Sequence, residues 1–159
     1  RVPLAFDNPY ALPDAVSPHL AARNEGVVID IGHIEASFHA LSQHTDAVVV
    51  EGAGGFIVPL HEAPGQFATS ADLATRLRLP VILVVGLRLG CLNHALLTQE
   101  AISRRGLTLA GWVANVIDPD MPEQAGNLAT LQQQLQAPLL AHWPFEPGRR
   151  SEDLALQLP

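Results

Sequence analysis

Short polar segments of this sequence carry residue types that could bind a charged ligand. In the first, VVVEGAGGFIVPL (residues 48–60), the acid Glu51 follows a run of valines and precedes a glycine-rich turn. A carboxylate supplies the hard oxygen ligand that Mg²⁺ prefers, together with phosphate oxygens of a substrate. Glycines also let backbone N–H groups approach an anion closely. These residues alone leave the alternative of a surface acid beside a tight turn open.

A second segment, LGCLNHA (residues 89–95), has the pattern of a helix that begins after a glycine. The first N–H groups of a helix lack partners within it, so those of Cys91, Leu92 and Asn93 could bind a carboxylate or a phosphate. The alternative is an ordinary helix start with Asn93 as a polar first-turn residue. Cys91 could be a nucleophile, but no histidine–acid pair at a strand end would activate it, so we expect a small buried residue.

A third segment, WVAN (residues 112–115), ends an apolar run with an asparagine. The Asn115 amide could pair with an adenine edge, because its carbonyl accepts from N6 and its N–H donates to N7. An asparagine that simply begins a turn is the alternative reading of the same residues.

Apolar runs and helical spacing indicate the elements that position these segments. The runs predict strands over residues 47–50, 81–86, 107–117 and 138–144. The run 81–86 is continuously apolar, as is typical of a strand buried on both faces. Spacing and capping residues predict helices over residues 17–26, 30–45, 67–80, 92–106 and 121–136, and a short last helix over 151–158. Asp30 is the expected cap of the second helix, and Thr69 or Ser70 is that of the third.

The alternation of strands and helices predicts an α/β fold, with a mostly parallel sheet and helices on both faces. Ligands of such sheets bind at the carboxyl ends of the strands. We therefore expect the segments that follow the strands to meet at one edge of the sheet. These segments are residues 51–55, 86–93, 115–118 and 144–146.

Length and composition predict one globular domain over residues 1–159. Hydrophobic residues make up 48% of the chain, and no apolar run is long enough to span a bilayer. The formal net charge of −7 argues against a nucleic-acid partner or an anionic membrane surface. The single cysteine suits a reducing cytoplasm, and the seven histidines show no paired spacing typical of zinc. All nine basic residues are arginine, so the chain contains no lysine.

Four motifs together resemble the dethiobiotin synthetase family: NPYALPDAVSPHLAA, VVVEGAGGFIVPL, PVILVVGLRLGCLNHALLT and GLTLAGWVAN. The resemblance implies a P-loop nucleotide-binding fold and an ATP- and Mg²⁺-dependent ligase of biotin biosynthesis. Such enzymes carboxylate 7,8-diaminopelargonate with CO₂, and ATP phosphorylates the resulting carbamate. Closure of the ureido ring then gives dethiobiotin, ADP and phosphate. The resemblance also implies a cytoplasmic homodimer whose substrate site lies across the interface.

The resemblance assigns binding roles position by position. It implies that Glu51 is a magnesium ligand within the nucleotide site. The residues that it places along the ATP phosphates are Gly52, Ala53 and Gly54. Those that it places around the base are Asn115, Val116, Pro144, Phe145 and Glu146. Those that it places on the substrate carboxylate are Gly90, Cys91, Leu92 and Asn93. Asn127 stands where some members carry a tyrosine near the substrate.

The chain departs from the family pattern at its beginning. The family's phosphate-binding loop ending in Gly-Lys-Thr is absent, and so is its catalytic lysine, so no catalytic residue is assigned. We expect the missing segment to carry a central strand beside residues 47–50, and we expect the 159 residues to be inactive alone. Two explanations stay open: the sequence is part of a complete enzyme, or the gene is a true fragment. Alternative functions are another nucleotide-dependent ligase of this fold group and a non-catalytic dimerisation or regulatory module.

Overall fold

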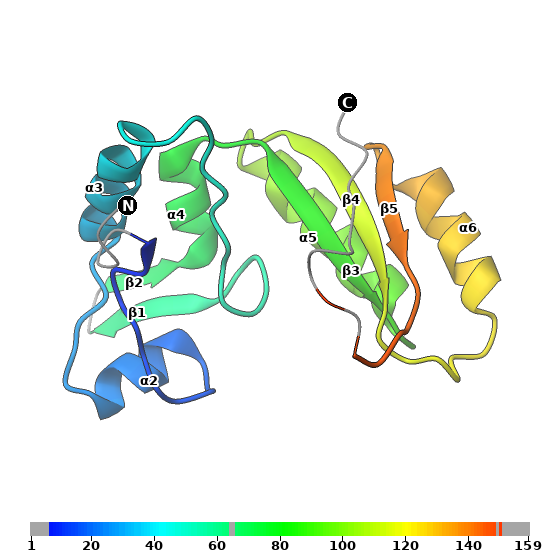
Figure 1. The fold of residues 1–159 in the computed structure, drawn as a ribbon, viewed down its shortest axis with the longest axis horizontal. Helices are drawn as coiled ribbons and strands as arrows, with labels where there is room; N and C mark the ends of the chain where they lie inside the picture. The colour runs from blue at the N-terminus through cyan, green and yellow to red at the C-terminus, as the bar shows by residue number, and fades with distance from the viewer. Residues whose placement is uncertain (1–6, 64–65, 149, 151–159) are drawn as a thin grey trace. The chain divides into compact units, whose positions relative to one another are not determined.

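The computed structural model describes residues 7–63, 66–148 and 150 of the chain (Figure 1). Two compact units divide it, residues 1–78 and residues 79–159. The predicted last helix, over residues 151–158, lies outside the described residues. Among the described helices, none has the length and apolarity that crossing a membrane would need.

The N-terminal unit begins with two helices at the predicted places, α2 (Pro18–Asn24) and α3 (Ile31–Ser42). Asp30 caps α3 as predicted, because its carboxylate accepts the backbone N–H of Gly32 at 2.8 Å. Ser17 precedes α2 but makes no side-chain capping hydrogen bond. The start of α2 therefore depends on the proline at its first position, whose fixed φ suits a helix.

The predicted strand over residues 47–50 is wrong for the described chain. These residues form no strand, and the side chain of Val49 is 93% exposed. A strand forms only where its backbone N–H and C=O groups meet those of a partner. Among the described residues, the two sheets consist of β1 with β2 and of β3 with β4 and β5, so none pairs with residues 47–50.

An antiparallel hairpin that the sequence did not predict follows the glycine-rich turn. Its strands are β1 (Pro59–Ala63) and β2 (Gln66–Thr69). Helix α4 (Ser70–Leu77) begins directly after β2, at the expected cap Thr69, and residues 67–69 ahead of it pair with β1 instead of joining the helix. Thr69 and Asp72 close the helix start with a capping box, and Arg78 ends the helix in a left-handed conformation.

The C-terminal unit is a parallel sheet with two helices, close to the prediction. The strand order is β3-β4-β5, and both neighbouring pairs are parallel (Figure 1). The strands are β3 (Val81–Leu87), β4 (Leu109–Val116) and β5 (Leu139–Trp143), and the helices are α5 (Cys91–Arg104) and α6 (Gln124–Gln134). Because each connection contains a helix, the strands run in the same direction and their carboxyl ends share one edge.

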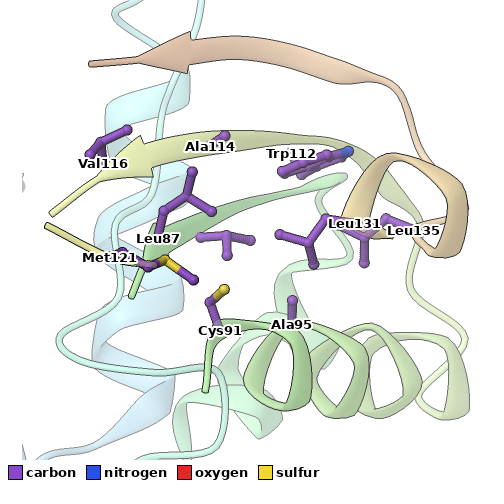
Figure 2. Close-up of a cluster of buried hydrophobic side chains, with 10 residues drawn as sticks. Leu87, Cys91, Ala95, Trp112, Ala114, Val116, Met121, Leu131 and Leu135 are labelled. Carbon is purple, nitrogen blue, oxygen red and sulfur yellow. The ribbon is translucent and has the colours of Figure 1, made fainter. Parts of the chain in front are cut away.

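One buried apolar cluster joins α5 and α6 to the same face of this sheet (Figure 2). Trp112, which belongs to this cluster, is fully buried. Of the predicted helices on both faces of the sheet, the described part of this unit has them on one face. The prediction that β3 is buried on both faces is wrong, because Ile82 and Val84 on the other side are 41% and 53% exposed. No described helix of the C-terminal unit covers that side.

Candidate functional site

The glycine loop, residues 51–55, lies in the N-terminal unit and is exposed along its whole length. Gly54 has a φ of +92°, a conformation that favours glycine over any residue with a Cβ atom. A Cβ atom added at Gly52 would meet nothing within 4 Å. The backbone of this loop is therefore open to a ligand, as the predicted role in binding phosphates requires.

The hydroxyl of Ser70 fastens the residues that follow this loop to the start of α4. Its oxygen accepts the N–H of Val58 at 3.0 Å and donates to the carbonyl of Phe56 at 2.7 Å. The carbonyl of Gly55 lies 3.3 Å from the same oxygen. The sequence offered Ser70 only as a helix cap, because nothing local signals a bond to residues twelve to fifteen positions away.

Glu51 fits a magnesium ion that is also held by phosphate oxygens. Its side chain is exposed, and among the described residues it forms no hydrogen bond or ion pair. No group of three or more histidine, cysteine or acidic side chains in the described chain could hold a metal by itself. Mg²⁺ is commonly bound through one or two carboxylates together with substrate phosphates. A single free carboxylate beside an open glycine loop satisfies that requirement.

In the C-terminal unit, the strand register brings three of the predicted segments to one edge. Asn115 on β4 is paired with Gly86 on β3 and with Trp143 on β5. The N–H of Asp118 donates to the carbonyl of Leu87 at 3.3 Å and ties the ends of β3 and β4 together. The segments over residues 86–93, 115–118 and 144–146 thus follow neighbouring strands, as predicted.

The side chains that could contact a base are Asn115 and Phe145. Asn115 is half-buried, and its amide makes no hydrogen bond to the described residues. Phe145 is 47% exposed, and Pro144 and Glu146 beside it are also exposed. Val116 is only 7% exposed and belongs to the apolar cluster, so it has only its backbone to offer a ligand.

The start of α5 differs in one respect from the prediction. The N–H of Cys91 is not free, because it donates to the carbonyl of Arg88 at 3.0 Å in the turn before the helix. The N–H groups of Leu92 and Asn93 have no acceptor among the described residues, as predicted. Gly90, the N-cap residue with a φ of +96°, has no side chain that could accept these N–H groups. An anion at this position could accept both N–H groups.

Two side chains of this helix start face the protein interior. Cys91 is 2% exposed. Its side chain lies in the apolar cluster, as Figure 2 shows. This confirms the prediction of a small buried residue over that of a nucleophile. Leu92 packs against the same cluster, whereas Asn93 is exposed. The side chain of Asn127, on α6, donates to the carbonyl of Glu123 at 2.9 Å, and its role near a substrate stays a prediction.

A parallel α/β sheet with polar residues at the carboxyl ends of its strands is an architecture in which ligands, nucleotides among them, bind at that edge. A family model described as "AAA domain" matches residues 3–152 of the chain. The class defined by the fold and this match is thus an α/β domain of the AAA, or P-loop, type.

Curated relatives narrow this class. Three of them, each named "ATP-dependent dethiobiotin synthetase BioD", are from Aromatoleum aromaticum, a Janthinobacterium species and Xylella fastidiosa. The first two are 53% identical over 151 and 139 residues, covering 95% and 87% of this chain. The third is 47% identical over 157 residues, covering 97% of this chain. The chain belongs to the dethiobiotin synthetase family. It spans 65%, 57% and 68% of the lengths of these relatives.

Proposed function

We propose that this chain forms part of an ATP-dependent dethiobiotin synthetase. The reaction converts 7,8-diaminopelargonate, CO₂ and ATP into dethiobiotin, ADP and phosphate. The observation that carries the proposal is the 53% identity over 151 residues to a protein of that name, an alignment that covers 95% of the chain. A single family match over residues 3–152 supports one α/β domain that includes both units. A biosynthetic role of this kind also suits the cytoplasm.

The glycine loop is proposed to hold the ATP phosphates. Its open backbone and the left-handed Gly54 support this role, because N–H groups in such turns form anion-binding concavities. Glu51 would hold Mg²⁺ against the phosphate oxygens. The ion, when bound, neutralises charge on the β- and γ-phosphates and so favours phosphoryl transfer. Glu51 itself contributes an oxygen ligand and a fixed position for the nucleotide.

The carboxyl ends of β4 and β5 are proposed to bind the base. The free, half-buried amide of Asn115 supports pairing with an adenine edge, which needs one donor and one acceptor. The exposed ring of Phe145 offers a face on which a base can stack.

The start of α5 is proposed to bind the carboxylate of 7,8-diaminopelargonate. The free N–H groups of Leu92 and Asn93 and the positive end of the helix dipole support an anion at this position. The family resemblance adds a homodimer in which this helix serves the partner's site. Sedimentation equilibrium of the full-length protein at micromolar concentration tests this arrangement, and a monomer would contradict it.

The replacement Glu51→Gln tests the proposed metal role. We expect the Mg²⁺ concentration for half-maximal dethiobiotin formation to rise at least about tenfold, since the variant loses an anionic ligand. Glu51 is exposed and unpaired, so the change in stability should stay within about 0.5 kcal/mol. Glu25→Gln is the matched control, because Glu25 is also an exposed acid of the N-terminal unit. Wild-type velocity of the Glu51 variant at limiting Mg²⁺ would contradict the assignment.

A further inference from the structure

Ser70 connects α4 to the part of the chain that leaves the glycine loop. One side-chain oxygen serves two backbone groups, as acceptor for the N–H of Val58 at 3.0 Å and as donor to the carbonyl of Phe56 at 2.7 Å. The backbone adds a further bond, from the N–H of Ser70 to the carbonyl of Val58 at 2.9 Å. We name these three hydrogen bonds the Ser70 clasp.

The position of Ser70 is itself fixed by its neighbours. Thr69 is paired with Pro59 across the hairpin, and the side chain of Asp72 accepts both the N–H and the hydroxyl of Thr69 at 2.7 Å. Ser70 is therefore held between a strand end and a capped helix start. A hydroxyl on so rigid a base can hold a neighbouring loop in one conformation, because its own rotamer and backbone have little freedom.

The glycine loop needs such an external restraint. Three of its five residues are glycines, which have the largest choice of backbone conformations and lose the most freedom when they are ordered. As the chain leaves the loop, the backbone groups of Phe56 and Val58 join it to the start of α4 through Ser70. Loss of the Ser70 hydroxyl would leave only the backbone bond of the clasp, so the loop would sample conformations that do not present its N–H groups together.

We propose that Ser70 is a positioning residue for nucleotide binding, which acts by pre-ordering the glycine loop. The inference rests on the proposed function, in which this loop holds the ATP phosphates. Ordering one additional residue on binding reduces affinity about five- to thirtyfold. Ser70 does not touch the ligand in this account; it sets how much freedom the loop must lose when the phosphates bind.

The test compares three variants of the full-length protein. Ser70→Ala removes the hydroxyl, Ser70→Thr keeps one, and Thr75→Ala is the control on the same helix. The Thr75 hydroxyl bonds only within α4, to the carbonyl of Ala71 at 2.8 Å. The measurements are the Kd for Mg·ATP by calorimetry, kcat, the melting temperature and hydrogen exchange of the Val58 amide. Ser70→Cys, with a side chain of similar size and a weaker donor, replaces Ser70→Ala if that variant does not fold.

We expect Ser70→Ala to raise the Kd for Mg·ATP about tenfold and to speed exchange at Val58 about tenfold. Thr75→Ala should change neither more than about twofold, and Ser70→Thr should restore most of the affinity. A Kd for Ser70→Ala equal to that of Thr75→Ala, with wild-type binding intact, would overturn the positioning role alone. Absence of Mg·ATP binding by the wild type would overturn the proposed function, and with it the role of Ser70.

Discussion

Gly54 offers the sharpest test of whether the observed glycine loop is the conformation that binds a nucleotide. Its φ of +92° lies where a residue with a Cβ atom is strained, and an alanine Cβ would also stand 3.4 Å from the Val58 side chain. The strain of Gly54→Ala amounts to about 1–2 kcal/mol. If binding requires the observed conformation, the variant must supply this energy on binding. The Kd for Mg·ATP should then rise about five- to thirtyfold.

The neighbouring Gly55 supplies the matched control. Its φ is not positive, and a Cβ atom there would stand at an ordinary 3.9 Å from Val58. Gly55→Ala should therefore leave the Kd within about twofold and stabilise the protein by about 0.4–1 kcal/mol through the unfolded chain. Calorimetric titration with Mg·ATP and thermal melting of both variants decide the matter. Equal losses of affinity, or no loss in Gly54→Ala, would refute the conclusion that this loop conformation binds the phosphates.

Three other perturbations test separate parts of the structure. Asn93→Asp should weaken diaminopelargonate binding about tenfold with little effect on Mg·ATP binding, because repulsion between like charges a few ångströms apart amounts to about 1–4 kcal/mol. If calorimetry shows that the affinities for both ligands fall equally, the variant is damaged in general and the assignment is contradicted. Gly111→Ala should lower the free energy of unfolding by about 1–3 kcal/mol, because its Cβ would lie 2.5 Å from the buried side chain of Leu140. Gly86→Ala should lower it less, because the Ile117 side chain, 2.6 Å away, is 45% exposed and can move. Equal midpoints of the two variants in urea unfolding would contradict this reasoning. The lysine-free chain of 159 residues alone should form no dethiobiotin, since it has no lysine side chain to neutralise the phosphates. Measurable turnover would contradict that.

The C-terminal unit shows where prediction from sequence succeeds. The strands β3, β4 and β5 and the helices α5 and α6 lie within a few residues of their predicted positions. Their apolar patterns and their capping or ending residues are local, and strong local patterns decide the type of an element. Parallel strands end at the same edge of a sheet, and the structure pairs Asn115 with Gly86 there. Three of the four predicted site segments could thus be assigned to one edge without a structure.

The N-terminal unit shows where it fails. Residues 47–50 have strand-forming side chains, yet no described strand pairs with them. Residues 67–69 were assigned to a helix but pair with β1 in a hairpin. Whether a short apolar segment becomes a strand depends on a partner segment, which its own sequence does not specify. The same limit applies to β3, whose apolar run could not reveal that one side is exposed.

The sequence by itself determined the kinds of chemistry available: the carboxylate of Glu51, the glycine-rich turn after it, and an amide at Asn115 where a strand ends. Only the tertiary structure decided which polar groups have hydrogen-bond partners and which are left for a ligand. It engaged the N–H of Cys91 with the carbonyl of Arg88 and joined Ser70 to the exit of the glycine loop. The physical reason is that residue type and spacing are local properties. Burial and hydrogen-bond partners depend on segments that meet only when the chain folds.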